Sequence, residues 1–408
     1  MPEPGAKKRI LYLLDDVNYP SGVRNATALQ ARALQGRFDV SALSLHPAGP
    51  EARALFAGIP FVDTSALQPL NSLHHPLGQV LVGRGYTLGQ RLLKLRQARA
   101  IIAQRQEAFN LKLFGGPLLP VMDNYDIVVV ASEASMFRPL AAQLKKARKV
   151  QWIHTDYARW KNYTLWARRM TRHDASLYAG FDAVVTLSAL CRDGFLALYP
   201  ALAGKTHSIR NLVAEDTIRQ KAGAGLAQST ALAPFNLITI GRLEAEKNLD
   251  ALLDTAGRLA REGHAYHWYL VGDGRLAQHV RKRIQAEGLA DKVILTGQMD
   301  NPYPLLAACD VMVLLSRYEG TPVTIDEAGV LGVPVVATQV GGIPDQICDG
   351  QTGRLLPLGN DLAQRAAAVL AGMIKDPHQL RAFRQNMAGA GPQNQATLAR
   401  LEDLFSAL

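Results

Sequence analysis

The chain has 408 residues, of which 48% are apolar, so it is long enough to form two domains of ordinary size. No stretch approaches the roughly 18 uncharged apolar residues that cross a bilayer, and Cys191, Cys309 and Cys348 are far apart without metal-ligand spacing. We therefore expect a cytoplasmic protein without a metal site. The net charge is +10, and basic residues crowd the range 84–172, which indicates an anionic surface or partner.

Five apolar runs in the first half predict buried strands that alternate with helical stretches. They occupy residues 9–14, 39–45, 126–131, 149–153 and 182–187. This alternation predicts a parallel, doubly wound α/β sheet. After the first run, Gly22 opens a helix over residues 23–34, and its lack of a Cβ would let backbone N–H groups approach a phosphate. A plain turn between strand and helix is the alternative.

Residues 88–102 have helical periodicity, with basic residues between the leucines. Leu88, Leu92, Leu95 and Ile102 share one face, which Arg99 interrupts. Such a helix could lie on an anionic membrane surface, or it could turn the leucines toward the core and leave a basic solvated side. Nucleic acid is a poorer explanation, because no binding motif or aromatic platform accompanies the charge.

A histidine ends the fourth predicted strand. His154 lies at the carboxyl edge, where open α/β sheets place their ligands, although a lone histidine is more often structural. The residues that follow, Asp156, Tyr157 and Arg159, would suit an acceptor sugar through stacking and ion pairing. They would equally suit a loop packed on the domain.

The second half repeats the alternation, with strands predicted at 235–240, 267–271, 292–295, 310–315 and 333–337. Arg242 and Lys247 bracket a turn after the first of these strands. A planar guanidinium and an ammonium placed there could hold a diphosphate and neutralise a departing phosphate. Gly272 belongs to a Gly-Asp-Gly turn that lacks the remaining glycine of a dinucleotide fingerprint. Asn248 is expected to cap the next helix with its side chain.

The range 310–345 is a strand, loop, helix and strand with a carboxylate on each side of the helix start. Glu319 follows the strand and Glu327 lies two turns into the helix. Thr321, Pro322 and Val323 surround the first turn, whose free N–H groups suit a phosphate. This element offers an anion site and two acceptors for sugar hydroxyls, unless Glu319 only caps the helix and Glu327 is solvated.

The spacing of Glu319 and Glu327, the strand VPVVAT, the run 340–345 and the run 349–357 resemble the nucleotide-sugar site of retaining family 4 glycosyltransferases of GT-B architecture. Proline at 322 departs from the more usual Gly-Phe-Gly-x-Pro run. The resemblance implies that Arg242 and Lys247 bind the diphosphate, that Gly272 and Gln298 lie near the nucleoside, and that Glu327 binds the ribose. It also implies that His154 faces the donor sugar.

The resemblance implies two Rossmann-like domains facing a central cleft, with an acceptor domain at 1–210, a donor domain at 211–390 and a terminal helix at 391–408. Glu319 and His154 would be the catalytic residues. We expect retaining transfer of a hexose, without metal or cofactor, from a UDP-linked donor to a glycan or lipid-linked acceptor, as in bacterial lipopolysaccharide or capsule assembly. A nucleotide-sugar epimerase and a non-catalytic sugar-nucleotide sensor are the alternatives. The site would be cytoplasmic, with the protein free or peripheral on the inner face of the plasma membrane.

Overall fold

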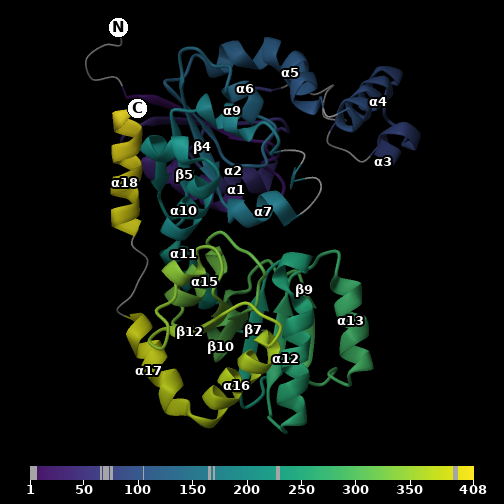
Figure 1. Ribbon diagram of the computed structural model, residues 1–408, viewed down its shortest axis with the longest axis vertical. Helices are drawn as coiled ribbons and strands as arrows, with labels where there is room; N and C mark the ends of the chain where they lie inside the picture. The colour runs from purple at the N-terminus through teal and green to yellow at the C-terminus, as the bar shows by residue number, and fades with distance from the viewer. Residues whose placement is uncertain are drawn as a thin grey trace. The chain divides into compact units, whose positions relative to one another are not determined.

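The structure is a computed structural model that describes residues 7–64, 67, 73, 77–103, 105–163, 167–168, 171–226, 230–388 and 394–408. They form two compact units (Figure 1). The first unit takes in the described residues of Met1–Leu187, Arg192–Leu212 and Gln395–Leu408. The second takes in those of Ser188–Cys191 and Val213–Asn394. Each unit contains one six-stranded sheet covered by helices, so the chain has the two doubly wound α/β units that the resemblance implies.

The sheet of the first unit is entirely parallel and follows the order β2-β1-β3-β4-β5-β6. Its strands are β1 (Arg9–Leu14), β2 (Asp39–Ser44), β3 (Ile127–Val130), β4 (Arg148–Ile153), β5 (Ala183–Thr186) and β6 (Thr206–Ser208). Successive side chains of β1 enter opposite hydrophobic clusters, Ile10 and Tyr12 on one face and Leu11 and Leu13 on the other. Both faces of the sheet are therefore buried, as the continuous apolar runs predict.

Helices cover both faces of this first sheet. The helices of this unit are α1 (Gly22–Leu34), α2 (Pro50–Leu55), α3 (Leu77–Val82), α4 (Leu88–Ile102), α5 (Gln106–Met122), α6 (Arg138–Ala141), α7 (Tyr157–Tyr163), α9 (Asp174–Ala179), α10 (Ala189–Leu198) and α18 (Asn394–Ala407). The terminal helix α18 packs Leu401, Leu404 and Phe405 into one cluster, and the Phe405 ring meets Phe38 edge-on at 6.1 Å between centroids. The last helix of the chain thus completes the core of the first unit.

The second unit has a parallel sheet in the order β12-β11-β10-β7-β8-β9. Its strands are β7 (Asn236–Ile240), β8 (His267–Val271), β9 (Val293–Gly297), β10 (Val311–Leu314), β11 (Val335–Thr338) and β12 (Gly353–Leu356). Its helices are α11 (Glu215–Ala222), α12 (Leu249–Arg261), α13 (Ala277–Ala286), α14 (Tyr303–Ala308), α15 (Val323–Val330), α16 (Leu362–Lys375) and α17 (Pro377–Ala388). The helix expected after Asn248 is α12, but Asn248 is left-handed (φ 54°) and makes no side-chain cap, so that part of the prediction is wrong.

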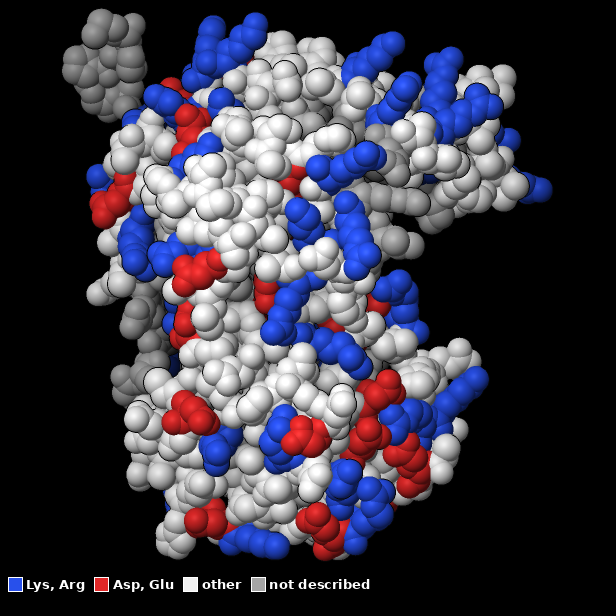
Figure 2. Space-filling view, viewed as in Figure 1, with Lys and Arg blue, Asp and Glu red and all other residues white. Residues whose placement is uncertain are grey.

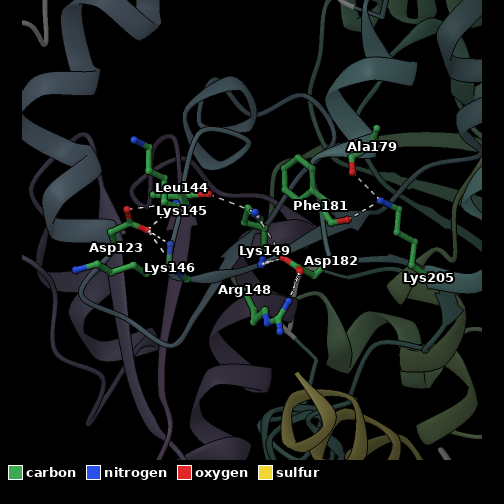
Figure 3. A network of polar contacts seen from close by, with 11 residues as sticks. Asp123, Leu144, Lys145, Lys146, Arg148, Lys149, Ala179, Phe181, Asp182 and Lys205 are labelled. Atoms are coloured by element: carbon green, nitrogen blue, oxygen red, sulfur yellow. Dashed lines mark hydrogen bonds and ion pairs between the residues drawn. The ribbon is translucent and has the colours of Figure 1, made fainter. Parts of the chain in front are cut away.

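Charged residues at the amino-terminal edge of the first sheet stabilise the fold. Figure 2 shows many Lys and Arg side chains over the first unit, with Asp and Glu among them on one side, and both signs of charge intermixed over the second. At the start of β4, the carboxylate of Asp123 accepts the backbone N–H groups of Lys145, Lys146 and Ala147, and Asp182 pairs with Arg148 at 2.9 Å (Figure 3). Burial opposes ionisation of Asp123, but the three N–H groups lower its pKa. These carboxylates serve backbone pairing rather than a ligand.

The helix at residues 88–102 forms as predicted, but its orientation differs from the core-facing interpretation. Lys94 is buried against the first unit, whereas Leu88, Leu92 and Ile102 are exposed. The core-facing interpretation is therefore wrong, because the polar side of α4 is the covered side. Among the described helices, none combines the length and the apolar character needed to cross a membrane.

Candidate functional site

The second sheet reverses its strand order between β7 and β10. From β7 the chain proceeds outward through β8 and β9, and from β10 it proceeds outward in the other direction through β11 and β12. The loops that leave the carboxyl ends of these two neighbouring strands diverge, and open α/β sheets bind ligands at such a place. Lys247 lies on the loop after β7, in the short helix Ala245–Lys247, and Glu319 lies on the loop after β10. The strand order therefore brings these two predicted residues to one edge.

Lys247 and Glu319 are in direct contact. The ammonium Nζ of Lys247 lies 2.6 Å from Oε1 of Glu319, and the hydroxyl of Ser316 donates to the same oxygen at 2.6 Å. The Lys247 and Glu319 side chains are only 14% and 13% exposed, so each charge needs the other. Within the described part of the chain, both hydrogen bonds to Glu319 go to Oε1. The carboxylate is thus oriented by two donors on one oxygen.

Arg242 is on the same loop as Lys247, but its side chain behaves differently. Its guanidinium is 68% exposed and pairs with Glu246 at 3.3 Å. Arg242 and Lys247, which were predicted to act together, therefore lie at one edge of the sheet. The ammonium of Lys247 contacts Glu319, whereas the guanidinium of Arg242 is exposed to solvent.

The first turn of α15 contains a buried hydroxyl without a partner. Pro322 precedes the helix, Val323 is its first residue, and no side chain caps this end. Glu319 is therefore not the cap that the alternative interpretation required. Thr321 is buried, and its Oγ1 has no hydrogen-bond partner in the described structure. A buried polar atom without a partner is uncommon and costs free energy unless a ligand or water satisfies it.

Glu327 lies further along α15 and is half-buried. The hydroxyl of Tyr303, from α14, donates to its Oε1 at 3.0 Å. Burial raises the pKa of Glu327 to about 7, and the Tyr303 hydrogen bond opposes this only partly. Glu327 is therefore not a solvated helix residue but a carboxyl group held in a fixed position.

Two glycines allow the loops at this edge to pack together. Gly272 has φ +138°, and a Cβ there would lie 2.0 Å from the carbonyl oxygen of Gly241. Gly341 has φ +54°, and a Cβ there would lie 1.8 Å from the carbonyl oxygen of Glu319. Gly272, a predicted nucleoside contact, thus has a packing reason to be glycine. Gln298, the other predicted nucleoside contact, is exposed just after β9.

In the first unit, His154 lies at the carboxyl end of β4 as predicted. Its backbone N–H donates to Glu133 Oε2 at 3.1 Å. Burial lowers the pKa of the imidazole, and the Glu133 carboxylate opposes that shift. His154 lines a small cavity of about 10 Å³, which it shares with Tyr12 and Asn211 among others, and this is room for a single water.

The predicted acceptor residues are engaged with one another and with the core. Asp156 accepts the backbone N–H of Arg159 at 3.2 Å and lies 3.5 Å from its Nε. Tyr157 is 1% exposed and packs among aromatic rings that include Phe195 and Tyr178. Its ring cannot stack on a sugar, so Tyr157 is corrected from an acceptor contact to a core residue. Gly22 is the exposed first residue of α1, whose N-terminus Ser21 caps.

The sequence analysis did not assign a role to Ser316, Tyr303 or Glu133. Ser316 could have been found, because it follows a buried strand directly and precedes Glu319 by three residues. Tyr303 and Glu133 carry no local signal, because each meets its partner only through the packing of separate elements.

Comparison with known proteins agrees with this arrangement of the second unit. Residues 234–376, which contain Lys247, Glu319 and Glu327, match the family described as Glycosyl transferases group 1. This segment, about a third of the chain, is what the chain shares with the glycosyl transferases group 1 family. The family match covers all six strands of the second sheet and the loops at their carboxyl ends.

Among curated proteins, the chain is similar to the alpha-D-kanosaminyltransferase of Streptomyces kanamyceticus, with 29% identity over 55% of this chain and 57% of that protein. It is also similar to the Vi polysaccharide biosynthesis protein VipC/TviE of Salmonella typhi, with 33% identity over 32% of this chain and 22% of that protein. The matched segments thus span about half or less of these relatives. Among solved structures, Anabaena Alr3699/HepE in complex with UDP and glucose matches with a TM-score of 0.70 and 17% identity, over 98% of this chain and 100% of that chain. This likeness shows the fold.

Proposed function

We propose that this protein transfers a hexose from a nucleoside diphosphate sugar, with UDP as the nucleotide, to a glycan or lipid-linked acceptor, and that it retains the anomeric configuration. The observation that carries the proposal is the contact between Lys247 and Glu319 at the point where the second sheet reverses. The pair places a cation for a diphosphate beside a carboxylate for a sugar, at the edge where such sheets bind ligands.

The diphosphate is assigned to Lys247 and the first turn of α15. An ammonium and the positive end of a helix both stabilise phosphate oxygens, and they do so more strongly as the leaving group gains charge. The Thr321 hydroxyl, buried and without a described partner, fits a further donor to that group. Arg242 is exposed and would have to leave Glu246 to join them.

The sugar and the ribose are assigned to the two carboxylates. Glu319 has Oε1 held by Lys247 and Ser316, which leaves Oε2 to accept sugar hydroxyls and to stabilise positive character at the anomeric carbon. Glu327 accepts the ribose hydroxyls when ionised, with Tyr303 fixing its position. His154, on the first unit, is assigned to orient the transferred sugar, and that role stays a prediction.

Transfer with retention requires no carboxylate nucleophile in this scheme. The bond from the anomeric carbon to the phosphate oxygen breaks, the acceptor oxygen bonds to the same face, and the departing phosphate takes the acceptor's proton. The choice of UDP is supported by the complex of Alr3699/HepE with UDP and glucose. A role in polysaccharide biosynthesis is supported by the similarity to the Vi polysaccharide biosynthesis protein.

The test has two stages. A panel of nucleotide sugars is first screened by thermal shift, because a ligand selective for the folded state raises its melting temperature. We expect UDP-hexoses to give the largest shift. The product formed with an oligosaccharide acceptor is then examined by NMR for its anomeric configuration, and an inverted product would overturn the assignment of retention. A new sugar nucleotide formed from donor alone would instead show an epimerase.

The variant Glu319→Gln makes the test specific for the site. We expect turnover to fall by about 10²- to 10³-fold, the range seen when one group that stabilises transition-state charge is removed. UDP itself should still shift the melting temperature, because the diphosphate contacts remain. Unchanged turnover would remove Glu319 from the reaction.

A further inference from the structure

The helix α4 displays an apolar stripe on the outside of the first unit. Leu88, Leu92, Leu95, Arg99 and Ile102 recur every three or four residues and therefore share one side of the helix. Leu88 is 74% exposed, Leu92 51% and Ile102 80%. Val82, at the end of the preceding helix α3, is 84% exposed. Exposed aliphatic side chains grouped on one side of a helix, here with Arg99 among them, mark an interaction surface more often than isolated exposed leucines do.

The packing of α4 against the first unit determines which side of the helix faces solvent. Lys94, on the opposite side of α4, is 9% exposed, and its Nζ donates to the carbonyl oxygen of Leu73 at 2.6 Å and to Oε1 of Gln97 at 2.8 Å. Leu93 packs against the hydrophobic cluster below. Turning the leucine stripe inward would break both Lys94 hydrogen bonds. The polar anchor therefore holds the apolar stripe in solvent.

The charged residues of α3, α4 and the sequence beside them are of one sign. No Asp or Glu occurs between Asp63 and Glu107, and the same stretch contains six Lys or Arg residues: Arg84, Arg91, Lys94, Arg96, Arg99 and Arg105. Arg84, Arg96 and Arg99 are exposed. In the view of Figure 1, α3 and α4 lie at the outer border of the first unit, and Figure 2 shows only blue charged side chains over them.

We propose that the α3–α4 surface, defined as the exposed side chains of Leu77–Val82 and Leu88–Ile102, docks on a lipid bilayer that contains anionic headgroups. The leucines enter the boundary between headgroups and acyl chains, and the arginines beside them bind the headgroup phosphates. Arginine side chains suit this position because their stems lie along apolar surface while the guanidinium stays at the polar boundary.

A bilayer fits the surface better than a protein partner does. Burying uncompensated arginines against a protein requires matching carboxylates on that partner, and the stretch between Asp63 and Glu107 supplies none for a second copy of itself. An anionic bilayer supplies negative charge at every point around an aliphatic stripe. The proposal does not depend on the proposed transferase reaction, because it rests on α3 and α4 alone.

The test is flotation of the full chain with vesicles of phosphatidylcholine and phosphatidylglycerol, compared with phosphatidylcholine alone. We expect the protein to float with the anionic vesicles and to be released by high salt, since exposed charges are screened. Leu92→Glu should weaken binding by at least about tenfold, because a charge replaces a leucine that would be buried. Leu358→Glu, at a leucine of the second unit that is 43% exposed, should bind like the wild type.

A second pair of variants tests how much the basic residues contribute to vesicle binding. Arg99→Gln should weaken binding to anionic vesicles by about fivefold, the effect of one basic residue near such a surface, whereas Arg281→Gln on α13 should not. No flotation of the wild type at low salt would overturn the proposal, as would wild-type binding by Leu92→Glu. Sedimentation without lipid decides the remaining outcome, because self-association abolished by Leu92→Glu would mean that the surface serves a second copy of the chain.

Discussion

The two sheets reverse their strand order at comparable places, and each reversal holds a carboxylate beside a serine hydroxyl. In the first unit, Asp15 after β1 accepts from Ser135, after β3, at 2.6 Å. In the second unit, Glu319 after β10 accepts from Ser316 at 2.6 Å. The difference is the third partner, which is the backbone N–H of Met136 for Asp15 and the ammonium of Lys247 for Glu319.

The third hydrogen-bond partner determines the electrostatic environment of each carboxyl group. With only neutral donors near it, burial raises the pKa of Asp15 to about 6, and the neighbouring Asp16 adds to that shift. Glu319 instead belongs to an ion pair with Lys247. The strand-order reversal of a doubly wound sheet can thus hold a carboxyl group whose pKa is raised to about 6, or a fixed pair of charges suited to a diphosphate sugar.

The largest expected effect comes from breaking the charged pair. Lys247→Met and Glu319→Gln should each lower kcat/KM by about 10²- to 10³-fold. The double variant should lose much less than the product of the two, because each residue positions the other. The measurement is a double-mutant cycle on the transfer rate, with Lys375→Met as a control for loss of an exposed charge. Strictly multiplicative losses would show that the contact has no role in catalysis.

The second-largest expected effect tests the close packing of Gly341 against the loop after β10, where the second sheet reverses its strand order. Gly341→Ala places a Cβ 1.8 Å from the carbonyl oxygen of Glu319 and imposes a left-handed alanine. We expect a loss of about 3 kcal/mol or more in the free energy of unfolding, measured in urea. Gly297→Ala is the matched control, because Gly297 has φ +72° with nothing near its absent Cβ. It should cost only about 1 kcal/mol, and equal losses would mean that the close approach is unimportant.

The raised pKa of Asp15, where the first sheet reverses its strand order, is tested by measuring stability as a function of pH. A carboxyl group whose pKa is raised in the fold makes the folded state less stable as pH rises from 3.8 to about 6, and this cost is fully present above pH 6. Asp15→Asn removes the charge. Its stability relative to the wild type should therefore increase with pH by up to about 3 kcal/mol. Urea unfolding across this range measures it, with the exposed Asp39→Asn as the charge control, and a difference that falls with pH would contradict the assignment.

The smallest expected effects come from removing the hydroxyl groups of Ser135 and Ser316. Ser135→Ala leaves Asp15 with one donor, so the pKa of Asp15 should rise further, which an NMR titration of the carboxyl group would detect. Ser316→Ala leaves Glu319 with Lys247, and turnover should fall by less than about tenfold. Each variant should cost about 1 kcal/mol of stability. A greater loss of turnover from Ser316→Ala than from Lys247→Met would reverse the order of importance of the two donors.

The predicted site residues of the two units differ in how much local sequence could say about them. Glu319 and Glu327 were selected because both follow one strand, one on the loop before a helix and one within that helix, where spacing has structural meaning. Asp156, Tyr157 and Arg159 were chosen by residue type alone. The structure shows Tyr157 in the core because four other aromatic rings, from α7, α9 and α10 and the turn after α10, surround it.

The amino-acid sequence by itself determined that there are two parallel α/β units, where five of the six strands in each sheet lie, and which loops carry carboxylates and cations, whereas it did not predict the edge strands β6 and β12. Runs of apolar residues, glycines and prolines act over a few residues, and so they can be read locally. Only the tertiary structure decided that Lys247 meets Glu319 across 72 residues, that Tyr303 holds Glu327, and that α4 turns its leucines outward. Strand order and the face of a helix that becomes covered depend on segments far away in the chain, and helical periodicity identifies a face without identifying its neighbour.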